Sequence, residues 1–156
     1  MRLLLDTNTC IEILRGRNAA LLARYAGQPR ADIALSAIVR SELLSGALLS
    51  AKPDENRRIA EAFCALFPCL SFDSKVADVH AEWHARLRRA GNIIGARDLM
   101  IAATALAHKL TVVTHNTDEF RRIDELSVED WQEGYGILAV AAFRCWNIRA
   151  LFPLFP

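Results

Sequence analysis

Three acidic residues occupy positions at which a parallel α/β sheet would bring them together. Asp6 directly follows three leucines at residues 3–5, an apolar run that predicts a short buried strand. Glu42 and Asp98 each lie close to the start of a predicted helix. In such a sheet the carboxyl ends of the strands and the first turns of the following helices share one edge, where ligands bind. We therefore expect the three carboxylates to converge there.

Convergence of these carboxylates would favour a metal ion. Glu42 and Asp98 stand within apolar stretches of the sequence, and a partly buried carboxylate is costly unless it is paired or coordinates a metal. Hard oxygen ligands favour Mg²⁺ or Mn²⁺. Such an ion activates water and stabilises charge on a phosphodiester during in-line attack. The chemistry that these residues indicate is metal-assisted hydrolysis of a phosphodiester.

Each acid also has a purely structural interpretation. Asp6 could cap the helix that follows it, and Asp98 could stabilise the dipole at the start of its own helix. Glu42 could pair with Arg40 or Arg97. A structural role for all three acids is the less favoured interpretation, because they come from different elements that meet at one sheet edge.

A further polar group follows the strand predicted at residues 111–113. Asn116 lies at the carboxyl end of this strand, and Asp118 and Glu119 come close behind. The strand would end at the same sheet edge as the strand before Asp6. An amide can bind a metal through its carbonyl oxygen or through a water molecule, but it adds no negative charge.

Segments of strand and helix character alternate along the chain, and Ser36 and Asp73 or Ser74 are suited to cap two of the helices. Short strands between helices imply an α/β fold of three layers, a parallel sheet of four to five short strands with helices on both faces. The predicted strands cover residues 3–5, 33–35, 70–72, 111–113 and 126–128, and the predicted helices cover residues 7–14, 19–26, 37–49, 55–66, 74–90 and 97–109, with one helical turn at 118–123.

Composition limits the kind of partner. A chain of 156 residues with 53% hydrophobic residues is long enough for one domain with a sizeable core. The formal net charge is +1, so a nucleic acid would have to be held by local arginines and not by bulk charge. Arg15 and Arg17, close to Asp6, are the candidates for contacts with RNA phosphates, although a solvated helix face is their default interpretation.

The cysteines and the two ends of the chain carry further signals. Four cysteines show no zinc-ligand spacing and lie in apolar surroundings, so we expect buried, reduced thiols and a cytoplasmic protein without a signal peptide or membrane span. Residues 133–156 form an almost wholly apolar extension of unknown role. It could pack on the domain or on another subunit, or stay poorly ordered; we put packing first, because exposed apolar surface invites aggregation.

Four sequence stretches carry a resemblance to a known family. They are LLLDTN at residues 3–8, SELLSGA at 41–47, IGARDLMIAA at 94–103 and VVTHNTDEF at 112–120. With these motifs, in this order, the chain resembles the PIN-domain ribonucleases, and specifically the VapC-type toxins of bacterial toxin–antitoxin pairs. The resemblance covers residues 1 to about 131 and suggests a PIN-like nuclease domain at residues 1–132, followed by the extension.

The resemblance implies an Mg²⁺- or Mn²⁺-dependent endoribonuclease that cuts RNA, with tRNA as the expected substrate. It further implies a homodimer that is inhibited by a small VapB-like antitoxin. The run at residues 114–117 looks like a subgroup that cleaves initiator tRNA.

Site roles follow from the same resemblance. Asn116 stands where family members often have a fourth acid, and Glu119 is the preferred substitute for that acid. Because Asn116 adds no negative charge, we expect a site for one metal. The resemblance assigns metal binding to Asp6, Glu42 and Asp98, and supporting hydrogen bonds to Thr7, Asn8 and Thr114.

Two other functions compete with this one. A haloacid-dehalogenase-like phosphatase also begins with a strand that ends in Asp, but it requires a second Asp two residues later, where this chain has Asn8. A PIN-like module that binds RNA or protein through a degenerate site is the non-enzymatic alternative, and the neutral Asn116 is its support.

Overall fold

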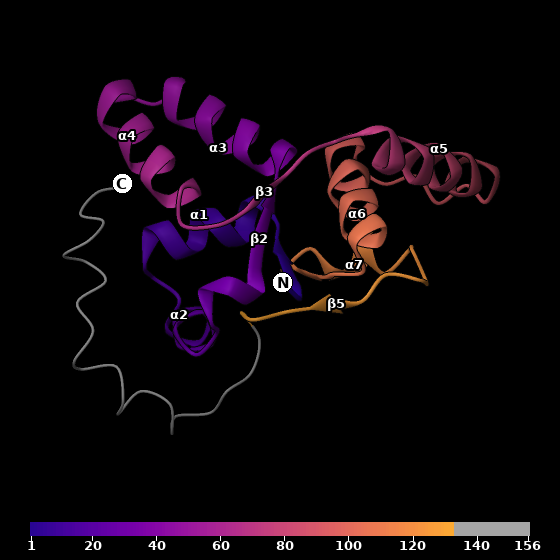
Figure 1. Ribbon diagram of the computed structural model, residues 1–156, viewed down its shortest axis with the longest axis horizontal. Helices are drawn as coiled ribbons and strands as arrows, with labels where there is room; N and C mark the ends of the chain where they lie inside the picture. Colours follow the sequence, from indigo (N-terminus) through magenta and orange to yellow (C-terminus); the bar gives the residue numbers. More distant parts are fainter. Residues whose placement is uncertain (133–156) are drawn as a thin grey trace.

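A five-stranded parallel sheet organises the computed structural model, which describes residues 1–132 (Figure 1). The strand order is β3-β2-β1-β4-β5, so β1 lies at the centre, and every neighbouring pair is parallel, as predicted. The expectations about the apolar extension and about Cys145 fall outside the described residues. The strands are β1 (Leu3–Leu5), β2 (Ile33–Ser36), β3 (Cys69–Leu70), β4 (Thr111–Val113) and β5 (Val128–Glu129).

Helices connect the strands and flank the sheet on both sides, with α1 and α2 on one side and α5 and α6 on the other in Figure 1. This arrangement is the three-layer α/β fold that the alternation of segments predicts. The helices are α1 (Thr7–Arg15), α2 (Ala19–Ala26), α3 (Ala37–Leu48), α4 (Pro53–Cys64), α5 (Ser74–Arg89), α6 (Ala96–His108) and α7 (Thr117–Phe120), and a 3₁₀ turn (Arg30–Asp32) precedes β2.

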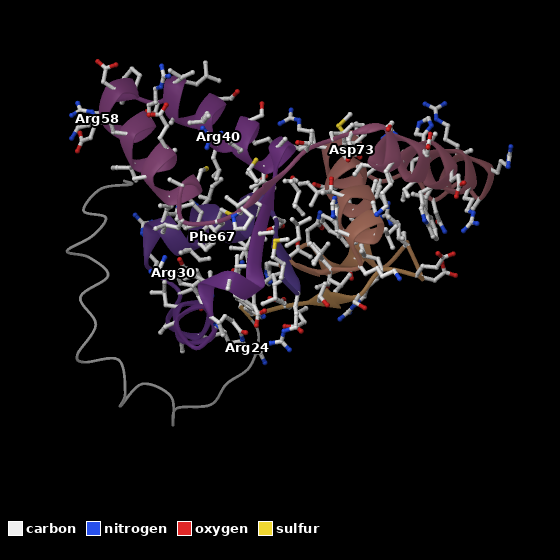
Figure 2. All side chains as sticks on the ribbon, viewed as in Figure 1. Arg24, Arg30, Arg40, Arg58, Phe67 and Asp73 are labelled. Atoms are coloured by element: carbon white, nitrogen blue, oxygen red, sulfur yellow. The ribbon has the colours of Figure 1, made fainter. Side chains whose placement is uncertain are left out.

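Capping residues explain where most of these helices begin. The side chains of Asp6, Asn18, Ser36 and Asp73 each accept a hydrogen bond from the backbone N–H three residues on, which satisfies a donor that the helix itself leaves free. Asp73, labelled in Figure 2, lies at the start of α5. The caps at Ser36 and Asp73 are those predicted from sequence. Asp6 and Ser36 directly follow β1 and β2, so each strand turns at once into a helix.

Most element boundaries differ from the prediction by one or more residues, and three of the differences have a clear physical cause. Helix α4 begins at Pro53, because proline suits the first helical position, where no N–H partner is needed. Strand β3 covers Cys69–Leu70, since only these two residues pair with β2. Strand β5 covers Val128–Glu129, because Leu126 is buried in the core before the chain reaches the ladder of β4.

The core lies around the central strand. Leu4 and Leu5 have no exposed surface, as expected for a strand that is covered on both faces. At the end of the described chain, the buried Trp131 donates its indole N–H to Glu129 over 2.8 Å. Arg24 of α2 donates to the carbonyl of Asp130 over 3.4 Å and so ties the segment after β5 to the first helices (Figure 2).

Cys10 and Cys64 are free and buried, as predicted, but Cys69 is exposed. The prediction was wrong for Cys69 because β3 is a two-residue strand at the edge of the sheet, where one side chain faces solvent. Among the described residues, no helix is long and apolar enough to cross a membrane.

Truncation of the central strand should cost far more stability than truncation of the surface. Leu4→Ala should lower the free energy of unfolding by roughly 2–5 kcal/mol, because it leaves a cavity in a core that has no solvent access. Leu49→Ala is the matched control, since that leucine is 88% exposed, and it should change the free energy by less than about 0.5 kcal/mol. Equilibrium urea unfolding measures both; equal costs would contradict the burial of β1.

Candidate active site

Asp6 is the most deeply buried of the acidic residues expected at the site, with 3% of its surface exposed. One carboxylate oxygen accepts the backbone N–H of Thr9 over 2.6 Å, and the other accepts the hydroxyl of Thr114 over 2.6 Å. Burial raises the pKa of Asp6, and the hydrogen bonds from Thr114 and Thr9 oppose that rise. Asp6 is therefore a helix cap, as the structural interpretation suggested, and it also lies at the predicted sheet edge.

Glu42, in α3, is held by two partners. Its Oε2 accepts the hydroxyl of Thr7 over 2.5 Å, and its Oε1 accepts a guanidinium N–H of Arg97 over 2.6 Å. The Glu42 side chain is 18% exposed and that of Arg97 is 72% exposed. The predicted alternative of an ion pair with Arg97 is thus realised, whereas Arg40 interacts with the Cys64 thiol instead (Figure 2).

Asp98 and Glu119 meet beside Gly95, at the start of α6. The backbone N–H of Gly95 donates to Glu119 Oε2 over 3.0 Å. A Cβ added to Gly95 would lie 3.4 Å from Asp98 Oδ2 and 3.6 Å from Glu119 Oε2. Both distances are ordinary van der Waals contacts, so the two carboxyl groups lie against the backbone of Gly95 on the same side.

The electrostatic environment of Asp98 links all four acids. Burial raises the pKa of Asp98 to about 6, and the negative charges of Glu119, Asp6 and Glu42 add to the rise, together with a hydrogen bond to Glu119. The four carboxyl groups therefore interact, as the predicted convergence requires. We refer to Asp6, Glu42, Asp98 and Glu119 as the acid cluster.

Asn116 links Asp98 to Asp6 by way of Thr114. Its side-chain amide donates to Asp98 Oδ2 over 3.3 Å, and its backbone N–H donates to Thr114 Oγ1 over 2.9 Å. The hydroxyl of Thr114 in turn donates to Asp6. Asp118 is exposed, so it is Glu119 that accompanies Asp98 as a further acid.

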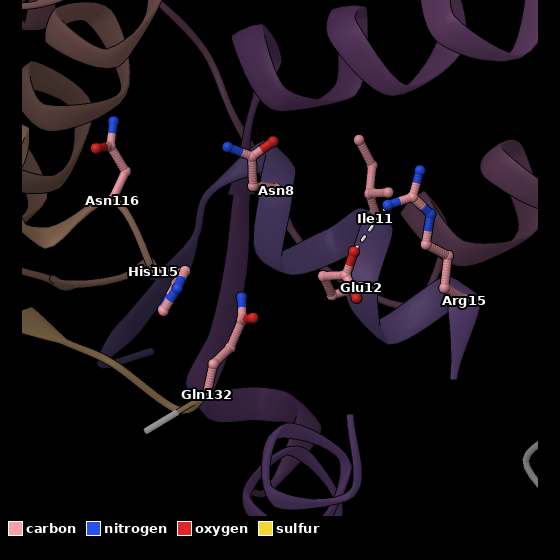
Figure 3. A pocket seen from close by; sticks show the side chains of 7 residues that line it. All are labelled: Asn8, Ile11, Glu12, Arg15, His115, Asn116 and Gln132. Carbon is pink, nitrogen blue, oxygen red and sulfur yellow. Dashed lines mark hydrogen bonds and ion pairs between the residues drawn. The ribbon is translucent and has the colours of Figure 1, made fainter. Parts of the chain in front are cut away.

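The remaining predicted residues lie on or near α1. Thr7 and Thr114 donate to acids of the cluster. Asn8 is exposed and lines a cavity beside the cluster, together with Arg15, which pairs with Glu12 over 2.8 Å (Figure 3). Arg17 is exposed beyond the end of α1, and no described contact brings it to the cluster.

Two contributors escaped the sequence analysis. Thr9 supplies the N–H that caps Asp6, and its hydroxyl donates to the carbonyl of Val113 over 3.1 Å, which fixes α1 to β4. Gly95 donates its backbone N–H to Glu119 over 3.0 Å. Neither contact could be inferred from spacing, because the partners Val113 and Glu119 lie far along the chain.

The donor chemistry of the acid cluster fits a hard divalent cation. Its four residues are buried or half-buried, and the negative charges of the neighbouring acids add to the rise that burial causes in the pKa of Asp98. Within residues 1–132, no three His, Cys, Asp or Glu side chains stand close enough to hold a metal ion directly. A bound cation would thus compete with the arginine that now pairs with Glu42.

The comparisons with known proteins identify the family of the chain. A family model of the PIN domain matches residues 3–126. The tRNA(fMet)-specific endonuclease VapC of Shigella flexneri is 33% identical over 131 residues, which are 84% of this chain and 98% of the relative. Ribonuclease VapC2 of Rickettsia felis is 34% identical over 136 residues, which are 83% of this chain and 98% of the relative.

Solved structures give the same result and confirm the PIN-like fold. The DNA-bound VapBC complex from Salmonella typhimurium contains a chain with a TM-score of 0.79 and 34% identity, and the match covers 84% of this chain and 98% of that one. FitAcB from Neisseria gonorrhoeae matches with a TM-score of 0.74 and 34% identity, covering 81% of this chain and 95% of that one.

Asp98 should make the metal-free protein less stable as the pH rises. Its folded pKa of about 6 lies above its ordinary value of 3.8, so the cost of ionising it in the fold is absent below about pH 4 and complete above about pH 7. In EDTA, Asp98→Asn should therefore raise the thermal midpoint more at about pH 8 than at about pH 4.5.

Asp118→Asn is the control for this measurement, because Asp118 is exposed and its removal should change the midpoint little at either pH. A gain from Asp98→Asn that is the same at both pH values would show that Asp98 carries no raised pKa.

Proposed function

The chain belongs to the PIN-domain family, and from this premise we propose that it is a metal-dependent endoribonuclease that hydrolyses a phosphodiester of RNA. The observation that carries the proposal is the acid cluster. Four carboxyl groups from separate elements interact strongly enough to help raise the pKa of Asp98 to about 6. Their mutual repulsion is relieved most directly by a cation, and oxygen donors favour Mg²⁺ or Mn²⁺.

Asp6, Glu42 and Asp98 are the proposed metal-binding residues, with Glu119 as the fourth acid. When bound, the ion would supply a nucleophilic water at neutral pH and stabilise charge on the scissile phosphate. Thr114 and the N–H of Thr9 orient the carboxylate of Asp6. Such hydrogen bonds fix the orientation of metal-binding side chains.

Asn116 and Thr7 hold the other acids in place. Asn116 donates to Asp98, and Thr7 donates to Glu42. In the absence of a metal, the guanidinium of Arg97 neutralises part of the charge of the cluster through Glu42. Arg97 is largely exposed, so this ion pair is weak and easily exchanged. We infer that metal binding frees Arg97 to contact an RNA phosphate.

The relatives suggest the substrate and the partner. One is named a tRNA(fMet)-specific endonuclease, and several solved structures are VapBC toxin–antitoxin complexes. We propose tRNA as the substrate and a small VapB-like antitoxin as the inhibitor, with the protein acting as a homodimer in the cytoplasm. Of the two arginines expected to contact RNA phosphates, we retain Arg17 for this role, because the ion pair of Arg15 with Glu12 offsets the charge of Arg15.

The other two interpretations lose support. Because the chain belongs to the PIN-domain family, we set aside the hypothesis of a haloacid-dehalogenase-like phosphatase. The non-enzymatic module depended on the neutral Asn116, but Glu119 lies beside Asp98 and supplies the further negative charge.

Cleavage of RNA should require both a divalent ion and the acid cluster. Purified protein with total tRNA and Mg²⁺ should give discrete fragments on a denaturing gel, and EDTA should abolish them. Asp98→Asn and Glu42→Gln should each lower the rate by more than about 100-fold, since loss of groups that merely orient ligands already costs roughly 10–100-fold. Asp118→Asn should cleave normally. Cleavage that persists in EDTA would exclude the metal mechanism.

Metal binding can be measured apart from cleavage. Titration calorimetry with Mn²⁺ should give about one ion per chain, because Asn116 adds no negative charge for a second ion. Glu119→Gln should weaken this binding about tenfold or more, whereas Asp118→Asn should leave the dissociation constant unchanged. Equal affinity of the two variants would show that Glu119 is not part of the metal site.

A further inference from the structure

A cavity of about 530 Å³ opens directly beside the acid cluster. Two of the residues that line the cavity lie next to acids of the cluster. Asn116 donates to Asp98, and Asn8 lies in the first turn of α1, two residues after Asp6. Figure 3 shows these two amides at one end of the cavity, with α1 along one wall and the segment before α7 along another. The volume falls within the range of small-ligand sites and is sufficient for a nucleoside.

We propose that this cavity is a nucleoside subsite, which binds the base and ribose of an unpaired nucleotide next to the scissile phosphate. The inference rests on the proposed RNA cleavage and assigns the part of the protein that reads the substrate. The lining residues are Asn8, Ile11, Glu12, Arg15, His115, Asn116 and Gln132.

The lining carries the groups that recognise nucleobases. The amides of Asn8, Asn116 and Gln132 each offer a donor and an acceptor, which match the edges of bases. His115 adds an aromatic ring that is 55% exposed. Recognition of unpaired RNA commonly combines such a ring, on which a base stacks, with side-chain hydrogen bonds to the base edge.

His115 is held by a hydrogen bond that orients its ring. Its Nδ1 lies 2.8 Å from Oδ2 of Asp130. When Nδ1 carries the proton, it donates a hydrogen bond to Asp130, and Nε2 is then a hydrogen-bond acceptor. A ring fixed in this way loses less entropy on binding a base than a freely rotating one.

The charge of the cavity favours a base and ribose over a phosphate. Arg15 is the one basic side chain of the lining apart from His115, and Glu12 pairs with it over 2.8 Å. The carboxylate of Glu12 cancels most of the attraction that a lone arginine would exert on a phosphate. Glu12 can instead accept hydrogen bonds from ribose hydroxyls or from an exocyclic amine of a base.

The subsite predicts coupling between one base and the lining residues. Binding would be measured by fluorescence anisotropy with the full-length chain carrying Asp98→Asn, which prevents cleavage. The probes would be tRNA-derived stem-loops in which each loop nucleotide in turn is abasic. One abasic position should weaken binding roughly tenfold, the typical effect of losing a stacked base. In the His115→Ala and Asn8→Ala variants, the same abasic position should weaken RNA binding by less than about twofold.

His84→Ala is the matched control, because His84 is exposed on α5, and it should retain the full abasic penalty. An abasic profile that is the same in the His115→Ala variant and in the control would overturn the inference. The inference would also be overturned if the His115→Ala and Asn8→Ala variants lost affinity for a purified antitoxin but kept the abasic profile. The cavity would then be a protein-binding site. The scan does not depend on cleavage, so a chain that binds RNA with this coupling but cuts none would contradict the proposed function alone.

Discussion

The burial of one carboxylate at the end of the central strand is the constraint on which the site depends. β1 has neighbouring strands on both sides, so its end lies deep in the molecule. Asp6, which follows it, is only 3% exposed. A carboxylate in this position needs hydrogen bonds to both oxygens. One comes from the first turn of α1 and the other from Thr114 after β4. The chain therefore has to bring these two segments together at the same edge before the other acids can take their places.

The other acids are arranged less rigidly around this fixed point. Glu42 is held by a hydroxyl and by the exposed Arg97, and Asp98 is half-buried between Glu119 and Asn116. The free energy cost of gathering like charges is thus spread over positions that solvent and a counter-ion can still reach. This arrangement suits the proposed cation, because a cluster whose carboxylates were all paired would gain little free energy from binding one.

Much of the fold is readable from the sequence, because its signals are local. Three leucines mark β1 and two β-branched valines mark β4, and Ser36 and Asp73 mark helix starts through hydrogen bonds that span only three residues. The edge strands were misplaced, since their two-residue ladders are set by pairing partners and not by local pattern. Convergence of Asp6, Glu42 and Asp98 followed from the parallel topology alone. The function of Gly95 could not be derived, because it depends on a side chain 24 residues away.

Helix α1 divides the tasks of the site between two faces. Thr9, Cys10, Ile13 and Leu14 are buried and join the helix to the sheet, whereas Asn8, Glu12 and Arg15 lie three or four residues apart on the face that lines the cavity. Substitutions on the cavity face disturb neither the core nor the cap, so their cost in stability is small. With the proposed roles of the cavity and the acid cluster, a few substitutions on one helix face would change the RNA that such a protein prefers while the acid cluster stays intact. Divergence of target among otherwise similar toxins requires no change of fold.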